Sequence, residues 1–429
     1  MTTEASESGS SFRAYYTLAA LVAGLVVGML AGHLGESTRD GALGVASFVG
    51  TLWLNALKMT VIPLVVALLI VGIAKSAEAA QAGRIAGRAV LWIVIICTAS
   101  AVIGAVGAVV LTHIFPLSRE TAQLLQQALG NVEQKASGPL PGAAEFFKGV
   151  VPPNVVAAAS NGDVLPLTVF AVIFALALTK ISSAGRTAVV TLFDAFSDAL
   201  LVVIAWVLAI APLGVFALAF TVGSTAGGAA FAGLGHYVII ISAIGILITL
   251  LAYPLAIILG RIGAGTFTRV LLPPQAVAIS TRSSLASLPA MLTASREAGI
   301  DDEAADVSLP IAVALFRATG PAMNVAVPFY VAHWLGLHPT MTQMIAATAV
   351  GAVMSYGAVS LPGEVSYISS IAPIAFALGV PIAPLGLLVA VEMVPDIFRT
   401  VGNVTHDVAL AAIVNRSART PSKGEQGAA

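Results

Sequence analysis

Charge is scarce in this chain of 429 residues. Only 10% of the residues are Asp, Glu, Lys or Arg, whereas 58% are hydrophobic, and the mean hydropathy is +0.97. Soluble proteins carry about 25% charged residues, so this chain cannot cover a folded surface with polar groups and is expected in a lipid bilayer. The single cysteine, Cys97, excludes an intramolecular disulfide framework and a CxxC metal site. A net charge of −1 argues against nucleic-acid binding, which needs clustered basic residues.

Long uncharged stretches predict where the chain crosses the membrane, because a spanning helix needs about 20 mainly apolar residues. No Asp, Glu, Lys or Arg occurs at positions 14–35, 89–118 or 199–260, and the last stretch is long enough for two crossings. With the remaining apolar runs, these stretches predict an all-α membrane protein with eight transmembrane helices, six of them within 13–260.

Basic residues predict the orientation of these helices, because short cytoplasmic loops carry an excess of Lys and Arg. If the helices alternate, one side receives Arg13, Lys75, Arg84, Arg88, Lys180, Arg186, Arg261, Arg269 and Arg416. Both termini are then expected in the cytoplasm and the helices in the inner (plasma) membrane. Residues 1–12 would form the N-terminal tail and residues 416–429 a disordered C-terminal tail.

The last third of the chain contains two apolar segments that are interrupted by polar and proline-containing stretches, at 280–289 and 355–362. Irregular backbone at membrane depth must be buried in protein or line an aqueous cavity, and paired interruptions of this kind are typical of a transporter site. The sequence therefore predicts two re-entrant helical hairpins, at 266–296 and 341–380. Helix seven is expected between them at 305–334, and helix eight after them at 385–413.

Six ionisable residues lie in these segments, where each costs at least about 2.5–3.5 kcal/mol to insert and is a functional candidate. They are Arg317, Glu364, Glu392, Asp396, Arg399 and Asp407. The four in helix eight, together with Asn403, are three or four positions apart and share one helical face, which must point away from lipid. A purely structural ladder of ion pairs between helices is the alternative.

Three motifs resemble those of a known family. Positions 280–289 read STRSSLASLP, positions 361–363 read LPG, and positions 396–407 read DIFRTVGNVTHD. They are similar to the two hairpin tips and the helix-eight signature of the dicarboxylate/amino acid:cation symporters, the glutamate and aspartate transporter homologues, and the likeness extends over nearly the whole chain. The resemblance implies an elevator-type homotrimer. Its scaffold would contain helices one, two, four and five, while helices three and six would move with a transport core at 261–415.

The resemblance also implies the binding site for a small anionic solute. Arg399 would hold a side-chain carboxylate and Asp396 an ammonium group, with further polar contacts from Thr400, Asn403, Ser283 and Ser284. Chemistry agrees, because a guanidinium presents a planar fork of donors to a carboxylate, and an aspartate accepts from an amine. The tip of the second hairpin, with Pro362, Gly363 and Glu364, would act as the gate.

Helix seven departs from the family pattern. Where the family has Asn-Met-Asp-Gly-Thr, positions 316–320 read FRATG, so the oxygens expected to bind sodium are missing. Asn403 and Asp407 would remain as a residual cation site. Arg317 then has three possible uses: a substitute for sodium beside Asp407, a second carboxylate clamp that favours dicarboxylates, or a structural ion pair. Coupling is left open between sodium, protons through Glu364 or Glu392, and exchange, with C4-dicarboxylates or neutral amino acids as alternative substrates. No cofactor is expected.

Two other functional classes fit less well. An enzyme would need Ser283 or Ser284 as nucleophile and His406 as base, but no catalytic motif supports that pairing. A channel would not need two interrupted hairpins around a charged helical face. The sequence therefore favours a secondary transporter.

Overall fold

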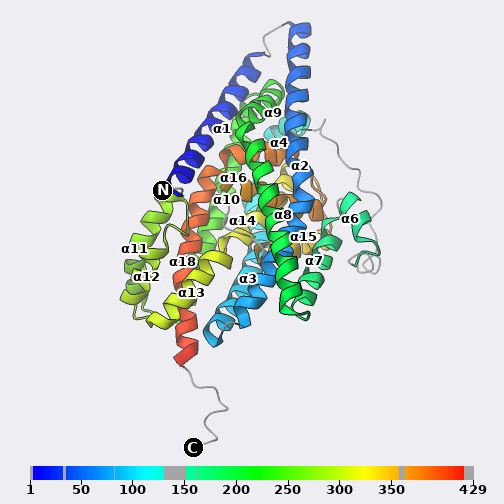
Figure 1. Ribbon diagram of the computed structural model, residues 1–429. Helices are drawn as coiled ribbons and strands as arrows, with labels where there is room; N and C mark the ends of the chain where they lie inside the picture. Colours follow the sequence, from blue (N-terminus) through cyan, green and yellow to red (C-terminus); the bar gives the residue numbers. More distant parts are fainter. Residues whose placement is uncertain are drawn as a thin grey trace, which may run out of the picture.

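The computed structural model describes residues 3–31, 35–81, 83–129, 151–161, 163–356 and 363–419. All regular elements in these ranges are helices (Figure 1). Five of the described helices are long and apolar enough to cross a membrane, namely Ser37–Ala80, Arg84–Ile114, Ser183–Ala209, Gly228–Leu259 and Asp302–Trp334. Four shorter helices are also apolar. The protein is therefore built as a multi-pass membrane protein.

One group of helices comes from the first half of the chain. It contains α1 (Thr3–Ala31), α2 (Glu36–Gln81), α7 (Val164–Leu178), α8 (Ser183–Ala209) and α9 (Ala211–Ala226), of which α2 contacts the last three. The backbones of α1 and α9 touch, because a side chain added at Gly28 would come within 2.3 Å of the Phe220 carbonyl oxygen. Pro212 in the first turn of α9 ends α8, since proline cannot continue a helix from its interior.

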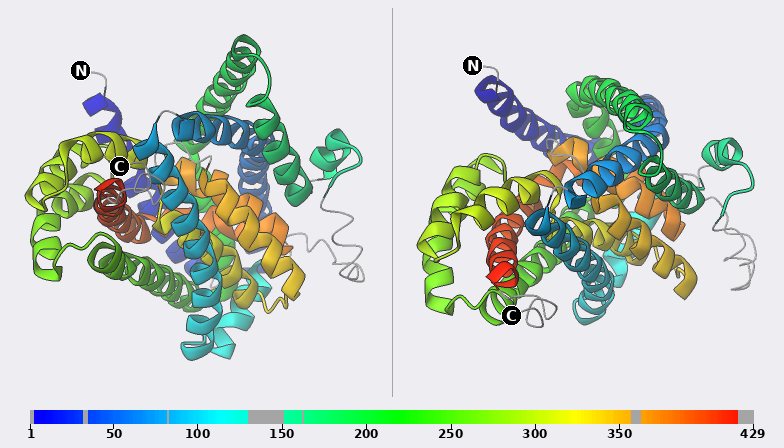
Figure 2. Two further views of the ribbon diagram at one scale, coloured as in Figure 1. Left: turned by 90° about the horizontal axis from the view of Figure 1, so that it is seen from below. Right: turned by 60° about the horizontal axis from the view of Figure 1, so that its bottom comes forward.

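A second group surrounds the long helix α18 (Met393–Arg419), as Figure 2 shows. Its other members are α3 (Arg84–Ile114), α10 (Gly228–Pro254) with η1 (Leu255–Leu259), α11 (Ala264–Thr281), α12 (Leu288–Glu297), α13 (Asp302–Leu315) and α14 (Thr319–Trp334). Helices α11 and α12 form an antiparallel hairpin, and each also contacts α18. Close contact continues to α3, where a side chain at Gly104 would come within 2.3 Å of the Ala322 carbonyl oxygen.

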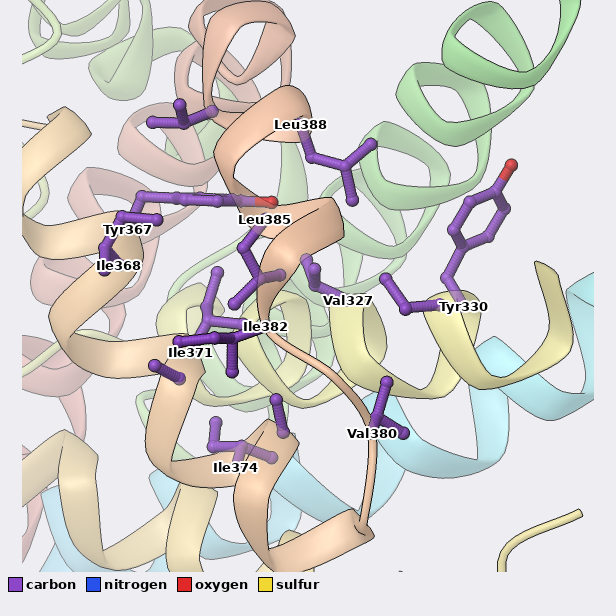
Figure 3. Packing of buried hydrophobic residues seen from close by; sticks show 14 of the residues in the cluster. Val327, Tyr330, Tyr367, Ile368, Ile371, Ile374, Val380, Ile382, Leu385 and Leu388 are labelled. Carbon is purple, nitrogen blue, oxygen red and sulfur yellow. The ribbon is translucent and has the colours of Figure 1, made fainter. Parts of the chain in front are cut away.

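A second helical hairpin consists of α15 (Met341–Tyr356) and α16 (Gly363–Leu378). It is followed by α17 (Ala383–Leu388) and η2 (Val389–Val391), which lead into α18. Figure 3 shows Tyr367, Ile371 and Ile374 of α16 packed with Ile382 and Leu385 in a buried apolar cluster. The short helices α4 (Arg119–Leu129) and α6 (Val155–Asn161) complete the described elements.

Helices α11 and α12 cover most of the segment expected at 266–296, and α15 and α16 most of the segment expected at 341–380. Helix seven was expected at 305–334, and the structure has helices there, with an interruption: α13 ends at Leu315 and α14 begins at Thr319. Pro321 explains the break. In a continuous helix its ring would clash with the carbonyl of Arg317, which instead accepts a hydrogen bond of 2.9 Å from Gly320 N. Helix eight extends beyond its expected end, to Arg419.

Candidate functional site

Arg399 lies at the centre of a buried cluster of charges on α18. Its Nη2 atom is 2.5 Å from Glu392 Oε1, and its Nη1 atom is 3.1 Å from Asp396 Oδ1. Asp396 is three residues earlier on the same helical face, and Glu392 occupies the turn just before α18. Only 12% of the Arg399 side chain and 2% of the Glu392 side chain are exposed. The charged face therefore points into the protein, as the spacing predicts.

Glu392 is also joined to two tyrosines from other helices. The Tyr237 hydroxyl on α10 donates a hydrogen bond of 2.9 Å to Glu392 Oε2, and the Tyr367 hydroxyl on α16 is 3.0 Å from the Tyr237 hydroxyl. All three side chains are almost completely buried. Satisfied hydrogen bonds in such a region are strengthened by the low dielectric constant. The carboxylate thus links the first turn of helix eight to helix six and to the second hairpin.

The first hairpin reaches the same cluster through Arg282. Its Nη1 atom is 3.8 Å from Asp396 Oδ2. Arg282 ends α11 in the left-handed conformation, with φ of 51°, where glycine would fit at lower cost. Next to it, Ser284 is buried, and Ser283 makes hydrogen bonds within its own turn, for example to Ala286 N. The hairpin therefore contacts Asp396 through Arg282, a residue that was not among the predicted site residues, while the roles of Ser283 and Ser284 stay predictions.

Asn403 connects α18 to the break in helix seven. Its Oδ1 atom accepts hydrogen bonds of 3.0 Å from Thr319 N and 2.6 Å from Thr319 Oγ1. The Thr400 hydroxyl donates to the Asp396 carbonyl, 2.9 Å away in its own helix. Gly402 allows α18 to approach, because a side chain there would come within 2.2 Å of Thr319 Cγ2. The amide oxygen of Asn403 thus has a structural partner in this conformation.

A second charged pair lies at the break itself. Neither carboxylate oxygen of Asp407, which is fully buried, has a hydrogen-bond partner among the described residues, and the same is true of Arg317 Nη2. Arg317 is close enough to Asp407 for their charges to attract each other, but no direct ion pair joins them among the described residues. Helix α3 holds this region, because the Ser100 hydroxyl donates to the Ala318 carbonyl and Cys97 packs beside Phe316. The two oxygens proposed as a residual cation site, on Asn403 and Asp407, thus face different partners.

The structure therefore brings charged residues of helix eight together with Arg282 of the first hairpin, and Asn403 together with Thr319 at the break in helix seven. Pro362 lies outside the described residues, as do the side-chain surroundings of Glu364 and the tip around Gly363. Arg282 carried a detectable signal, since it is a charge at a hairpin tip. Tyr237 and Tyr367 carried none, because nothing in their local sequence separates them from other aromatic residues of apolar helices.

Comparison with known proteins identifies the family of this chain. The sequence profile of the sodium:dicarboxylate symporter family matches residues 15–417. The chain belongs to this family. The expected resemblance is confirmed, and the protein is a membrane transporter, which decides against the enzyme interpretation.

Several characterised relatives cover most of the chain. It is 26% identical over 411 residues to the proton/glutamate-aspartate symporter of Escherichia coli (strain K12), which covers 94% of this chain and 91% of the relative. It is 29% identical over 376 residues to the proton/sodium-glutamate symport protein of Bacillus subtilis (strain 168), covering 85% and 84%. It is 26% identical over 394 residues to the C4-dicarboxylate transport protein of Anaeromyxobacter sp. (strain K), covering 91% and 87%. The names of these relatives thus refer to acidic amino acids in two cases and to C4-dicarboxylates in the third.

Proposed function

We propose that this symporter carries an acidic amino acid or a C4-dicarboxylate across the inner membrane and that Arg399 binds a carboxylate of the solute. The observation that carries this proposal is the buried Arg399 guanidinium between Glu392 and Asp396. A guanidinium in this setting binds carboxylates through parallel, charge-assisted hydrogen bonds. The names of the relatives support the same two classes of substrate.

Asp396 favours the acidic amino acid over the dicarboxylate. Its carboxylate would accept hydrogen bonds from the ammonium group while Arg399 holds the side-chain carboxylate. Ser283 and Ser284, next to Arg282, would donate to the main-chain carboxylate, and Thr400 and Asn403 would complete the polar lining. A C4-dicarboxylate remains the second candidate, because Arg282 offers another guanidinium 3.8 Å from Asp396.

The arrangement of the helices supports an elevator mechanism with eight spanning helices and two re-entrant hairpins. Helices α1, α2, α7, α8 and α9 pack chiefly on one another and would form the scaffold, with α8 and α9 as one kinked crossing. Helices α3 and α10 pack against α14 and α18 and would move with the core at 261–415. The outer face of α8 is apolar, with Leu192 66% and Trp206 68% exposed. That face suits lipid or a second subunit of a homotrimer. Both termini are proposed to be cytoplasmic.

Coupling is proposed to differ from sodium symport at the break in helix seven. Arg317 places a fixed positive charge beside Asp407, which has no hydrogen bond of its own among the described residues. A sodium ion would need several oxygen ligands, yet positions 316–318 offer the side chains Phe, Arg and Ala. The guanidinium therefore takes the place of the coupling cation. In the rival role, Arg317 would clamp a second carboxylate of the substrate.

Uptake into liposomes tests the substrate assignment. Purified protein should take up labelled aspartate, glutamate or succinate saturably, and a neutral amino acid poorly. Arg399→Lys should abolish this uptake, because an ammonium group cannot present the planar fork. Arg296→Lys is the matched control, since Arg296 is exposed on α12 and pairs with Asp302. Equal uptake by the Arg399 variant, or ohmic conductance in place of saturation, would contradict the assignment.

Separately imposed sodium and proton gradients test the coupling. Uptake should be unchanged when sodium is omitted, and a proton gradient should drive accumulation. Strict sodium dependence would exclude Arg317 as a substitute for the cation. In the clamp role, Arg317→Met would lower succinate uptake far more than aspartate uptake, whereas the substitute role predicts similar effects on both substrates.

A further inference from the structure

The buried carboxylates around α18 differ in how many cations they contact. Asp396 is shared between Arg399 and Arg282, at 3.1 and 3.8 Å. Asp407 is attracted by Arg317, which belongs to the break in helix seven and forms none of the ion pairs around Arg399. Glu392 has one cationic partner, Arg399, at 2.5 Å. Among the carboxylates whose side chains the structure describes at this site, Glu392 therefore depends most on Arg399.

Binding of a substrate carboxylate to Arg399 would separate Glu392 from its cationic partner. Arg399 pairs through Nη2 with Glu392 and through Nη1 with Asp396, whereas Nε has no hydrogen-bond partner among the described residues. A substrate carboxylate that forms the usual two parallel bonds uses Nη2 together with Nη1 or Nε, so it competes with Glu392 for Nη2. Asp396 retains Arg282 after displacement, whereas Glu392 retains only the Tyr237 hydroxyl. Glu392 is thus the group that would be left as a buried charge without a counterion, which is a costly state.

The net charge of the Arg399 cluster also points to Glu392. Arg282 and Arg399 neutralise Asp396 and Glu392 when no solute is bound, so this cluster has zero net charge. An acidic amino acid brings a net charge of −1 into a site where the side chains are almost completely excluded from water. One bound proton restores neutrality.

We propose that Glu392 is the proton-binding group of the transporter. In the substrate-free state its carboxylate pairs with Arg399. When the substrate takes the place of Glu392 on Arg399, Glu392 binds one proton. The proton comes from water on the side from which the substrate enters, and forms an O–H bond on a Glu392 oxygen. The protonated group then stays hydrogen-bonded to Tyr237, whose hydroxyl also contacts Tyr367. Release of the substrate returns Glu392 to Arg399 and the proton to water. This inference rests on the proposed role of Arg399 in binding.

Three helices contribute the polar groups that act on Glu392. Helix α18 contributes Arg399 and Asp396, α10 contributes Tyr237, and α16 contributes Tyr367. The first hairpin acts indirectly, because the Arg282 guanidinium lies 3.8 Å from the Asp396 carboxylate and partly neutralises it. The two tyrosines are neutral hydrogen-bonding groups, so among the described side chains Arg399 alone forms an ion pair with Glu392.

The pH dependence of substrate affinity tests the proposal. Binding of aspartate to the purified protein is measured by isothermal titration calorimetry across the neutral and alkaline range. In the wild type, the Kd should rise by about tenfold per pH unit at the alkaline end, as expected when one proton accompanies binding. In Glu392→Gln the Kd should not change with pH, because the amide imitates the protonated acid. Glu392→Asp, which keeps an ionisable group, should retain the slope.

Proton uptake by the wild type gives a second measurement that needs no variant. Titrations in buffers with different ionisation enthalpies should report about one proton taken up per aspartate bound. A flat pH profile or no proton uptake in a wild type that binds aspartate would overturn the role of Glu392 and leave the proposed function intact. An unchanged slope in Glu392→Gln would overturn it too. If the wild type binds neither acidic amino acids nor C4-dicarboxylates at any pH, the proposed function itself fails.

Discussion

Replacement of Arg399 by glutamine should destabilise the protein even without a substrate. The variant leaves Glu392 without its cation and weakens the pairing of Asp396, which keeps only Arg282 at 3.8 Å. Removal of one partner from a buried ion pair costs about 3–5 kcal/mol, because the other charge stays buried and unpaired. Since only 12% of the Arg399 side chain is exposed, solvent screening reduces this cost little. The free energy of unfolding should fall by an amount in that range.

A double-mutant cycle tests this reasoning. If the loss comes from the unpaired carboxylate, Arg399→Gln combined with Glu392→Gln should be less destabilised than the sum of the single variants. Residues in direct contact show coupling energies of about 0.5–3 kcal/mol, and a buried pair at 2.5 Å should fall in the upper part of that range. The free energies are measured by denaturant unfolding in mixed micelles. Additive losses would refute the assignment of Arg399 as the cation that neutralises Glu392.

Two further predictions concern the packing around the site and an exposed ion pair. Gly402→Ala should lower stability by about 1–3 kcal/mol or more in thermal unfolding, because its new side chain would come within 2.2 Å of Thr319 Cγ2. Gly235→Ala, on the open face of α10, should be neutral or slightly stabilising and serves as the control; equal losses would disprove the close approach. Lys75→Ala should change stability by less than about 1 kcal/mol and transport hardly at all, because the Lys75 and Asp194 side chains are 47% and 41% exposed; a large loss of either would contradict this.

The architecture was largely predictable because charge is so rare in this chain. Uncharged stretches marked the long helices, and the interruptions at 280–289 and 355–362 marked the two hairpins. The inward orientation of Glu392, Asp396, Arg399 and Asp407 also followed from their spacing alone, since charges cannot face lipid. In these cases one strong physical term, the cost of charge in an apolar medium, dominates the alternatives.

The break in helix seven was not part of the sequence prediction, although its cause is local. The sequence predicted a helix at 305–334 with Arg317 as a buried charge. Pro321 contains the signal, because a proline disturbs the carbonyl four residues earlier, which is that of Arg317. Prolines also occur inside α13 and α14 without ending them, at Pro310 and Pro328. Which proline breaks the helix depends on tertiary contacts, here those of Thr319 with Asn403.

The partners of the charged residues depend still more on tertiary structure. Tyr237 and Glu392 are 155 positions apart, and nothing near Tyr237 in the sequence indicates an acidic neighbour. The contact exists because α10 and α18 pack side by side, which allows the hydroxyl to reach the carboxylate. Arg282 shows the opposite case. Its charge is visible in the sequence, yet its role depends on a turn that directs it towards Asp396.

Neutrality of the site suggests how transport and proton binding are coupled. Three arginines (Arg282, Arg317 and Arg399) face three carboxylates (Glu392, Asp396 and Asp407) among the described side chains, so the substrate-free core can move without a net buried charge. A core that has bound an acidic amino acid but no proton would carry one excess negative charge through the low-dielectric part of the membrane, which costs several kcal/mol. Protonation of Glu392 removes this charge. The transport core can then cross the membrane when it is empty or when it has bound both substrate and proton. A core with substrate but no proton cannot cross, and this is the condition for obligatory coupling.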